Sequence, residues 1–263
     1  MQKEILESTT ISIFGRKGLG KTVGSSILIN NLEKETLVFD ITGAYTKDTL
    51  VKDALYLTID TRVDNSVLKL ILEQFKEHQK IVLDMSRLTR RELVEFTELM
   101  FKLINSVGDV AVVIDEVGEV ASQQREYYSP ELERCVRIGR NYGIKPFIMI
   151  TQRTQKVDKN ILALSDYYIV FGLTHNLDLK AVQELTGLDN EQFEPLKKSI
   201  KNMGVGKCEI IKFTGENQKA YFDLVSNSLR EATPQNTRQQ EIIKNIKKVE
   251  KWCLMFLNVK YTE

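Results

Sequence analysis

The residues from Gly15 to Thr22 read GRKGLGKT and match the pattern G-x-x-x-x-G-K-T. Glycines let the backbone curl so that successive N–H groups face a phosphate, and a helix that begins at Lys21 adds the positive end of its dipole. The Lys21 ammonium would reach the β- and γ-phosphates, and the Thr22 hydroxyl would ligate Mg²⁺. The pattern predicts that ATP and Mg²⁺ bind at Gly15, Arg16, Lys17, Gly18, Leu19, Gly20, Lys21 and Thr22. A chance match is the alternative, but ISIF before the motif favours a strand and VGSSILINNL after it favours a helix.

An acidic pair ends the apolar run DVAVVIDE. We expect Asp115 to hold Mg²⁺, partly through its water shell, and Glu116 to orient and deprotonate the attacking water. A strand that ends in a solvated acidic turn is the alternative, and alone it would be the better interpretation. With a phosphate loop about a hundred residues upstream, the pair predicts an ATPase with a dedicated catalytic glutamate, which is typical of motor ATPases and not of metabolite kinases.

Two further positions could act on the phosphates. Gln152 follows the apolar run FIMIT, where its amide could bind the γ-phosphate or the lytic water and report hydrolysis. Arg134, Arg137 and Arg140 are spaced to share one helix face, and one of them could reach the site of a neighbouring subunit as an arginine finger. An ordinary strand-end turn and a solvated helix face are the respective alternatives.

The elements that must position these residues alternate along the chain. β-rich runs occur at Thr10–Phe14, Thr36–Asp40, Ala54–Ile59, Lys80–Asp84, Val110–Asp115, Pro146–Ile150 and Tyr167–Phe171. Helical patterns occur at Lys21–Leu32, Ser66–Glu77, Arg91–Ser106, Ser129–Tyr142 and Leu177–Thr186. Almost wholly apolar strands that alternate with helices predict an α/β fold, a three-layer P-loop NTPase with a mostly parallel central sheet flanked by helices.

Composition excludes several classes of protein. Lys plus Arg is 37 and Asp plus Glu is 36, so a polyanion such as DNA must be bound by a local basic patch. The scattered cysteines and two histidines make a zinc site unexpected and suit a reducing cytoplasm. The N-terminus has no signal-peptide pattern, and no apolar run is long enough to span a membrane.

The chain changes character near residue 228. A polar stretch around Pro234 is followed by an apolar stripe at helical spacing, which includes Ile242, Ile246 and Trp252. We therefore expect an ATPase domain over residues 1–227 and a C-terminal helical appendage over 228–263.

Together the motifs resemble those of the HerA/FtsK superfamily of ring-forming, DNA-pumping P-loop ATPases, from about Ile11 to Leu185. The segments that carry the resemblance are GRKGLGKT, VFDITGAY, IVLDMSRL, VVIDEVGEV, RIGRNYGIKPFIMITQR and DYYIVFGL, with Asp178 following. The resemblance implies that Arg140 is the finger in trans, Gln152 the sensor and Arg153 its neighbour, and that Asp40 lies near the active site. Two positions depart from the family pattern: Ala44 stands where an acidic residue is common, and Thr154 where proline is common.

The resemblance implies a hexameric ring that moves double-stranded DNA in packaging, transfer or repair. The short chain is similar to the minimal motors of viruses and mobile elements. A single-strand helicase and a nucleotide-dependent assembly protein without DNA translocation are the alternatives. The loop Ser122–Ser129 is a candidate pore loop, and an ordinary surface loop is the alternative. Basic clusters, each more simply a solvated helix face, are Arg87, Arg90 and Arg91; Lys197, Lys198 and Lys201; and Lys244, Lys247, Lys248 and Lys251.

Overall fold

The computed structural model describes residues 1–60, 65–223 and 226–231. Met1–Arg230 form one compact unit. Of the predicted C-terminal appendage, Ser228–Glu231 form a strand, and residues 232–263 lie outside the described part of the chain. None of the described helices is long and apolar enough to cross a membrane.

The described unit is built on one ten-stranded sheet. In spatial order the strands are β10 (Ser228–Glu231), β9 (Asn217–Asp223), β8 (Lys207–Lys212), β7 (Tyr167–Val170), β1 (Thr10–Phe14), β6 (Phe147–Thr151), β5 (Ala111–Asp115), β2 (Thr36–Asp40), β4 (Lys80–Asp84) and β3 (Ala54–Thr58). From β7 to β3 every neighbouring pair is parallel, whereas β8 runs antiparallel to both β7 and β9. The predicted α/β fold with a mostly parallel sheet is confirmed.

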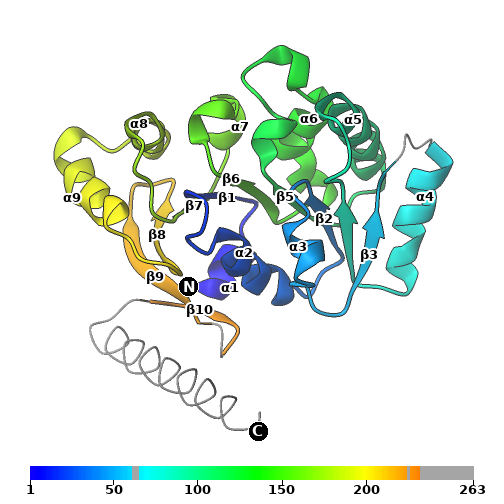
Figure 1. The fold of residues 1–263 in the computed structure, drawn as a ribbon, viewed down its shortest axis with the longest axis horizontal. Helices are drawn as coiled ribbons and strands as arrows, with labels where there is room; N and C mark the ends of the chain where they lie inside the picture. Colours follow the sequence, from blue (N-terminus) through cyan, green and yellow to red (C-terminus); the bar gives the residue numbers. More distant parts are fainter. Residues whose placement is uncertain (61–64, 224–225, 232–263) are drawn as a thin grey trace, which may run out of the picture. The chain divides into compact units, whose positions relative to one another are not determined.

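Helices cover both faces of the sheet (Figure 1). They are α1 (Gln2–Leu6), α2 (Lys21–Asn30), α3 (Ala44–Lys47), α4 (Asn65–Glu73), α5 (Arg90–Val107), α6 (Pro130–Ile138), α7 (Lys159–Leu162), α8 (Asn176–Thr186) and α9 (Asn190–Lys201). Short 3₁₀ helices are η1 (Gln74–Lys76), η2 (Val117–Glu119), η3 (Arg125–Tyr127), η4 (Gly139–Tyr142) and η5 (Thr154–Lys156).

Strand β5 shows why the sheet is buried on both faces. Val112 and Ile114 belong to the hydrophobic cluster that also contains residues of α5, α6, α8 and α9. Ala111 and Val113 belong to a second cluster, which contains residues of α1 and α2. Successive side chains of a strand point to opposite faces, so a continuous apolar run fills both layers at once.

The antiparallel end of the sheet packs against the helix that follows the phosphate loop. The rings of Phe171 and Phe222 stack with centroids 5.7 Å apart. A Cβ on Gly24 of α2 would lie 2.7 Å from the ring of Phe222 and 2.9 Å from that of Phe171. A glycine at this helical position is therefore required by close packing and not by backbone conformation.

We expect Gly24→Ala to lower the free energy of unfolding by up to about 2 kcal/mol. Overpacking a core costs roughly 1–3 kcal/mol, while alanine gains about 1 kcal/mol over glycine in a helix. Chemical denaturation of the two proteins measures the difference. Gly204→Ala is the matched control, because nothing lies within 4 Å of the Cβ it would add. A free energy of unfolding about 1 kcal/mol higher for Gly24→Ala than for wild type would show that β9 does not press on α2, because only the gain in helix propensity would then remain.

Candidate nucleotide-binding site

The predicted site residues follow three neighbouring strands at one edge of the sheet. β6 lies between β1 and β5, with Phe14 opposite Thr151 and Ile114 opposite Met149. Because the strands are parallel, the phosphate loop, the acidic pair and Gln152 all emerge at the carboxyl edge, where open α/β sheets bind ligands. The structure therefore brings these predicted residues together, as the motif spacing requires.

The backbone of the phosphate loop adopts conformations that favour glycine. Gly18 and Gly20 have φ angles of 82° and 95°. Gly15 lies so close to Phe171, the residue after β7, that a Cβ on Gly15 would be 2.6 Å from the Cβ of Phe171. Gly20 is the N-cap of α2 and supplies no side chain, so the helix begins without a side-chain cap. A helix N-terminus of this kind is suited to bind an anion.

Lys21 lies inside the loop and not in solvent. Its side chain is buried, and Nζ donates a hydrogen bond to the carbonyl oxygen of Arg16 at 3.1 Å. Burial lowers the pKa of the ammonium, and the carboxylates of Glu116 and then Asp115 oppose that change. The lysine is thus held over the loop, with one hydrogen bond to exchange for a phosphate oxygen.

Asp115 is buried beside the loop that follows β2. Thr42 Oγ1 donates a hydrogen bond to its Oδ2. Burial raises the pKa of Asp115 from 3.8 to about 6; the Thr42 hydrogen bond opposes this shift, and the Asp40 and Glu116 carboxylates add to it. A cation bound at this carboxylate would offset the cost of burying its charge.

Glu116 begins the turn after β5 with a left-handed backbone, at a φ of 55°. Its carboxylate points to the neighbouring strand. Thr151 Oγ1 donates to Oε1 at 2.9 Å, and the backbone N–H of Gln152 lies 3.3 Å from both oxygens. A non-glycine residue in this conformation costs of order 1–3 kcal/mol and is most often found at functional sites.

The segment after Gln152 is anchored to α8. Asp178 is almost fully buried, and its Oδ1 accepts a hydrogen bond from Thr154 Oγ1 at 3.1 Å. Oδ2 of the same carboxylate lies 3.5 Å from Nη1 of Arg153. The family commonly has proline at position 154. Here Thr154 instead donates a hydrogen bond to Asp178, the same carboxylate that pairs with Arg153.

Asp40 ends β2 directly beside Asp115 on β5 and Asp84 on β4. Its Oδ2 accepts hydrogen bonds from the N–H and the hydroxyl of Thr46, at 2.8 and 2.9 Å. Its Oδ1 is buried and has no hydrogen-bond partner within the described residues. Burial is the main cause that raises the pKa of Asp40. The position beside Asp115 agrees with what the family resemblance implied.

Arg140 lies at the opposite edge of the sheet. It belongs to η4, whose last residue, Tyr142, accepts a hydrogen bond from the N–H of Asp109 just before β5 begins. Arg140 is exposed and has no ion-pair partner among the described residues. It therefore does not join the residues at the carboxyl edge of its own sheet.

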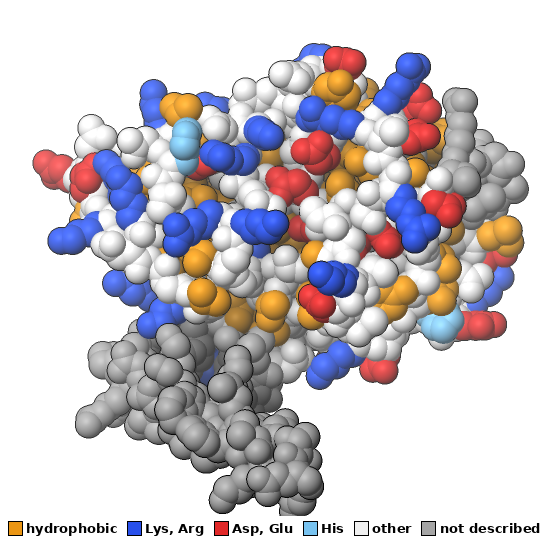
Figure 2. Space-filling view, in the orientation of Figure 1, with side chains coloured by type: hydrophobic (Ala, Val, Ile, Leu, Met, Phe, Trp, Pro, Cys, Tyr) orange, Lys and Arg blue, Asp and Glu red, His pale blue; other side chains and the backbone are white. Residues whose placement is uncertain are grey.

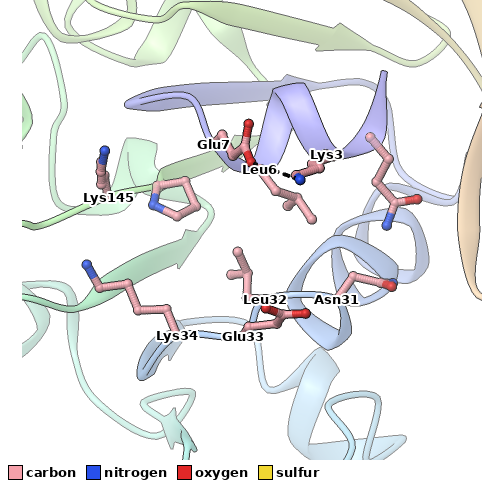
Figure 3. A pocket seen from close by; sticks show the side chains of 10 residues that line it. Lys3, Leu6, Glu7, Asn31, Leu32, Glu33, Lys34 and Lys145 are labelled. Atoms are coloured by element: carbon pink, nitrogen blue, oxygen red, sulfur yellow. Dashed lines mark ion pairs between the residues drawn. The ribbon is translucent and has the colours of Figure 1, made fainter.

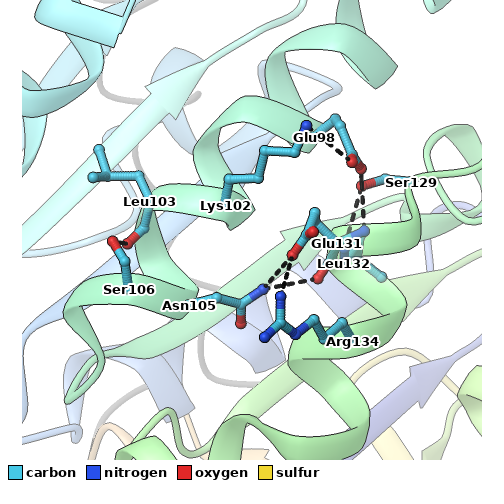
Figure 4. Close-up of polar contacts among 9 residues, drawn as sticks. All are labelled: Glu98, Lys102, Leu103, Asn105, Ser106, Ser129, Glu131, Leu132 and Arg134. Atoms are coloured by element: carbon cyan, nitrogen blue, oxygen red, sulfur yellow. Dashed lines mark hydrogen bonds and ion pairs between the residues drawn. The ribbon is translucent and has the colours of Figure 1, made fainter.

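The helix that leads to Arg140 is fixed to α5 by polar contacts (Figure 4). Glu98 accepts hydrogen bonds from Ser129 Oγ at 2.7 Å and from the N–H of Glu131 at 3.1 Å, so a carboxylate lies at the N-terminus of α6. Arg134 pairs with Glu131 at 3.6 Å on the same helix, and Arg137 pairs with Glu133 at 3.8 Å. Of the three arginines predicted to share a face, two are thus paired within α6.

A groove of about 820 Å³ also lies away from the phosphate loop (Figure 3). Its lining comes from α1, the end of α2 and the segments before β2 and β6, and it includes Lys34 and Lys145. Lys34 pairs with Asp109 at 2.7 Å, which places the groove at the edge where the strands begin. Cavity volume alone would therefore not locate the predicted site; the backbone and charges of the loop do.

The residues present fit a magnesium nucleotide. The φ angles of the loop and the uncapped N-terminus of α2 suit phosphate oxygens, and Lys21 supplies a cation. Thr22 at the start of α2 and the Asp115 carboxylate supply the oxygen ligands that Mg²⁺ prefers.

No protein-family model matches this chain, and no curated protein matches it. Among solved structures, VirB4 of Thermoanaerobacter pseudethanolicus aligns with a TM-score of 0.59 and 12% identity, over 87% of this chain and 91% of that one. The genome packaging NTPase B204 of Sulfolobus turreted icosahedral virus 2 in complex with ATP-γS aligns with a TM-score of 0.54 and 15% identity, over 86% and 98%. The chain has the fold of these proteins. The predicted P-loop NTPase fold is thereby confirmed.

Sequence reasoning did not single out two hydroxyl groups at this site. Thr42 donates to Asp115 and Thr151 donates to Glu116. Thr42 lies two residues after the end of β2, in the segment VFDITGAY, and Thr151 is the last residue of β6, in the segment FIMITQR. Their position beside the motifs was a signal, but which carboxylate each would bind depends on the order of the strands.

We expect Asp115→Asn to make the ligand-free protein more stable at pH 8 by on the order of 1–3 kcal/mol, and to make no difference below pH 4. The pKa of Asp115 is about 6 in the folded protein, against the ordinary value of 3.8 that applies to the unfolded chain. Between these values the folded state keeps a proton that the unfolded state has lost, so stability falls as the pH rises. Denaturant titration at the two pH values measures the difference.

The exposed residue Asp48 provides a matched control as Asp48→Asn. A stability difference for Asp115→Asn that stayed constant from pH 4 to pH 8 would contradict the ionised, buried state of this carboxyl.

Proposed function

We propose that this chain is a subunit of an ATP-hydrolysing ring motor that translocates double-stranded DNA. The observation that carries the ATPase part is the convergence of the phosphate loop, Asp115, Glu116 and Gln152 at the ends of three adjacent strands. The shared fold with a genome packaging NTPase supports the motor part.

The proposed reaction is attack of water on the γ-phosphorus of ATP. The bond between water oxygen and phosphorus forms as the bond between phosphorus and the β,γ-bridging oxygen breaks, which gives ADP and inorganic phosphate. Glu116 takes the water proton and later releases it to solvent. Lys21 balances phosphate charge, and Thr22 and Asp115 would hold Mg²⁺, which neutralises further charge on the phosphates. Gln152, whose backbone N–H lies 3.3 Å from Glu116 Oε1, would sense the γ-phosphate through its side-chain amide.

We expect Glu116→Gln to retain ATP binding and to hydrolyse ATP at least ~100-fold more slowly, because a neutral amide cannot accept the water proton. Lys21→Ala should lose nucleotide binding or turnover. Fluorescent-nucleotide titration and phosphate release measure the two properties separately.

Glu191→Gln is the matched control, since Glu191 is exposed in the first turn of α9. Wild-type turnover by Glu116→Gln would remove Glu116 from the reaction, and purified wild type that ignored Mg-ATP would end the ATPase proposal.

The proposed partner is duplex DNA. The displayed face mixes Lys and Arg with Asp and Glu and has no uninterrupted basic surface (Figure 2). DNA contact would therefore depend on a few groups from each subunit around a ring. In the candidate pore loop, the guanidinium of Arg125 lies 4.4 Å from the ring centroid of Tyr128, and that of Arg90 lies 3.8 Å from the ring of Tyr127. These rings are covered by arginines of the same chain, which favours contact through the arginines over base stacking.

Stimulation of ATP hydrolysis by duplex DNA separates the motor from a nucleotide-dependent assembly protein. Displacement of a strand from a forked duplex would favour the single-strand helicase instead. Mass in solution with a non-hydrolysable nucleotide gives the ring size, proposed here as six.

In the proposed ring, Arg140 completes the site of the next subunit. Its own phosphate loop lies at the other edge of the sheet, and the described residues offer it no ion-pair partner. Tyr142 in the same short helix and Val107 at the end of α5 are exposed apolar side chains, 51% and 65% accessible. A Cβ on Gly108, which follows Val107, would clash with the carbonyl oxygen of Tyr142, so Val107 and Tyr142 lie at the same edge. An unpaired guanidinium flanked by apolar groups suits a subunit interface.

We expect Arg140→Ala to bind ATP as a monomer and to lose most turnover in the assembled ring, because the cation that stabilises the transition state is missing. Mixing Arg140→Ala subunits with Lys21→Ala subunits should restore part of the activity. In mixed rings some intact phosphate loops receive Arg140 from a neighbour.

Arg137→Ala is the matched control, because Arg137 pairs with Glu133 on its own helix. No recovery on mixing, at a ratio where both variants enter rings, would contradict action in trans.

A further inference from the structure

The carboxylate of Glu116 is held by the strand beside its own. Oε1 accepts the Thr151 hydroxyl at 2.9 Å, and the Gln152 N–H lies 3.3 Å from each oxygen. Oε1 therefore has two donors, whereas Oε2 has only the longer contact with the Gln152 N–H. A general base needs one oxygen to accept a proton and a fixed direction toward the water that supplies it.

The direction of the Thr151 hydroxyl proton follows from its other contact. Thr151 Oγ1 accepts the N–H of Arg153 at 3.1 Å. A hydroxyl group has a single proton, so with a donor on one side Thr151 directs that proton at Glu116. The threonine therefore acts as a donor with one orientation and not as a freely rotating hydroxyl.

The surroundings keep this hydroxyl in place. Thr151 is fully buried at the end of β6, and a Cβ on Gly118 would lie 3.8 Å from its Oγ1. Downstream, Asp178 holds Thr154 at 3.1 Å and Arg153 at 3.5 Å. The segment that begins at Thr151 is thus tied to a carboxylate on each side, the partly buried Glu116 before it and the buried Asp178 after it.

We propose that Thr151 is a positioning residue that orients the Glu116 carboxylate for attack of water on ATP. It engages Oε1 and leaves Oε2 to accept the proton of the lytic water. This inference rests on the proposed ATPase function and adds a residue that acts through Glu116, without touching the nucleotide. The competing explanation is that Thr151 only packs the end of β6, in which case its shape matters and its hydroxyl does not.

The test compares Thr151→Val, which keeps the shape and removes the hydroxyl, with Thr151→Ser, which keeps the hydroxyl. We expect Thr151→Val to lower kcat about tenfold, with KM and nucleotide affinity near wild type, and Thr151→Ser to stay within about twofold of wild type. Steady-state phosphate release and nucleotide titration give these values. If Thr151→Val does not fold, Thr151→Ala against Thr151→Ser makes the same comparison.

A second measurement asks whether Thr151 acts through Glu116. In the Glu116→Gln background, Thr151→Val should cause no further loss of kcat, because the oriented carboxylate is already absent. Equal and additive losses in both backgrounds would overturn the proposal, as would wild-type kcat or a raised kcat in Thr151→Val. A loss in Thr151→Ser as large as in Thr151→Val would overturn it too.

The outcomes separate this inference from the proposed function. If wild type hydrolyses ATP and Glu116→Gln does not, the ATPase part of the proposed function stands, whatever Thr151→Val does. If Glu116→Gln hydrolyses ATP like wild type, the role of Glu116 is wrong and the role of Thr151 fails with it.

Discussion

The structure depends on keeping charged side chains buried at the carboxyl edge of the sheet. Three charged side chains there are nearly inaccessible to water: Lys21, Asp40 and Asp115. Burial lowers the pKa of Lys21 and raises the pKa of both aspartates, and each shift favours the neutral form. Burying charge costs free energy unless a partner or a ligand compensates. The hydroxyls of Thr42 and Thr46 compensate in part. A magnesium nucleotide would supply the remaining charges, so the same arrangement that weakens the empty protein favours the bound one.

The rest of the fold makes this burial possible. Apolar runs such as AVVI place side chains in the hydrophobic clusters on both faces of the sheet. The left-handed backbone of Glu116 then turns the chain sharply, so that a carboxylate points sideways at β6. The cost of that conformation is borne by packing on both sides of β5, because the strand itself is fully buried.

Much of this could be predicted from the sequence, for identifiable reasons. The strands from Thr10–Phe14 to Tyr167–Val170 are strongly apolar. The phosphate loop needs backbone conformations that favour glycine, so the glycines of its motif indicate it in the sequence. The antiparallel strands β8 and β9 were not predicted, because Lys207–Lys212 and Asn217–Asp223 mix charged and apolar residues at the sheet margin. Helix α9 was not predicted either. The contacts of Thr42 and Thr151 depend on strand order, which spacing along the chain does not encode. The predicted C-terminal helix falls within residues 232–263, outside the described residues, and stays a prediction.

The course of α6 gives the proposed ring a direction. The chain leaves the acidic pair at the carboxyl edge, enters α6 at Pro130 and reaches η4 at the edge where the strands begin. Glu98 fixes the start of this helix, and Ile144 closes its end through a hydrogen bond to Gly139. In the proposed ring, the candidate nucleotide site at one edge of a subunit would meet Arg140 at the opposite edge of the next subunit, which is a head-to-tail contact. A repeated head-to-tail contact closes into a ring or continues as an open helix of subunits, and in a closed ring every site would receive an arginine from its neighbour.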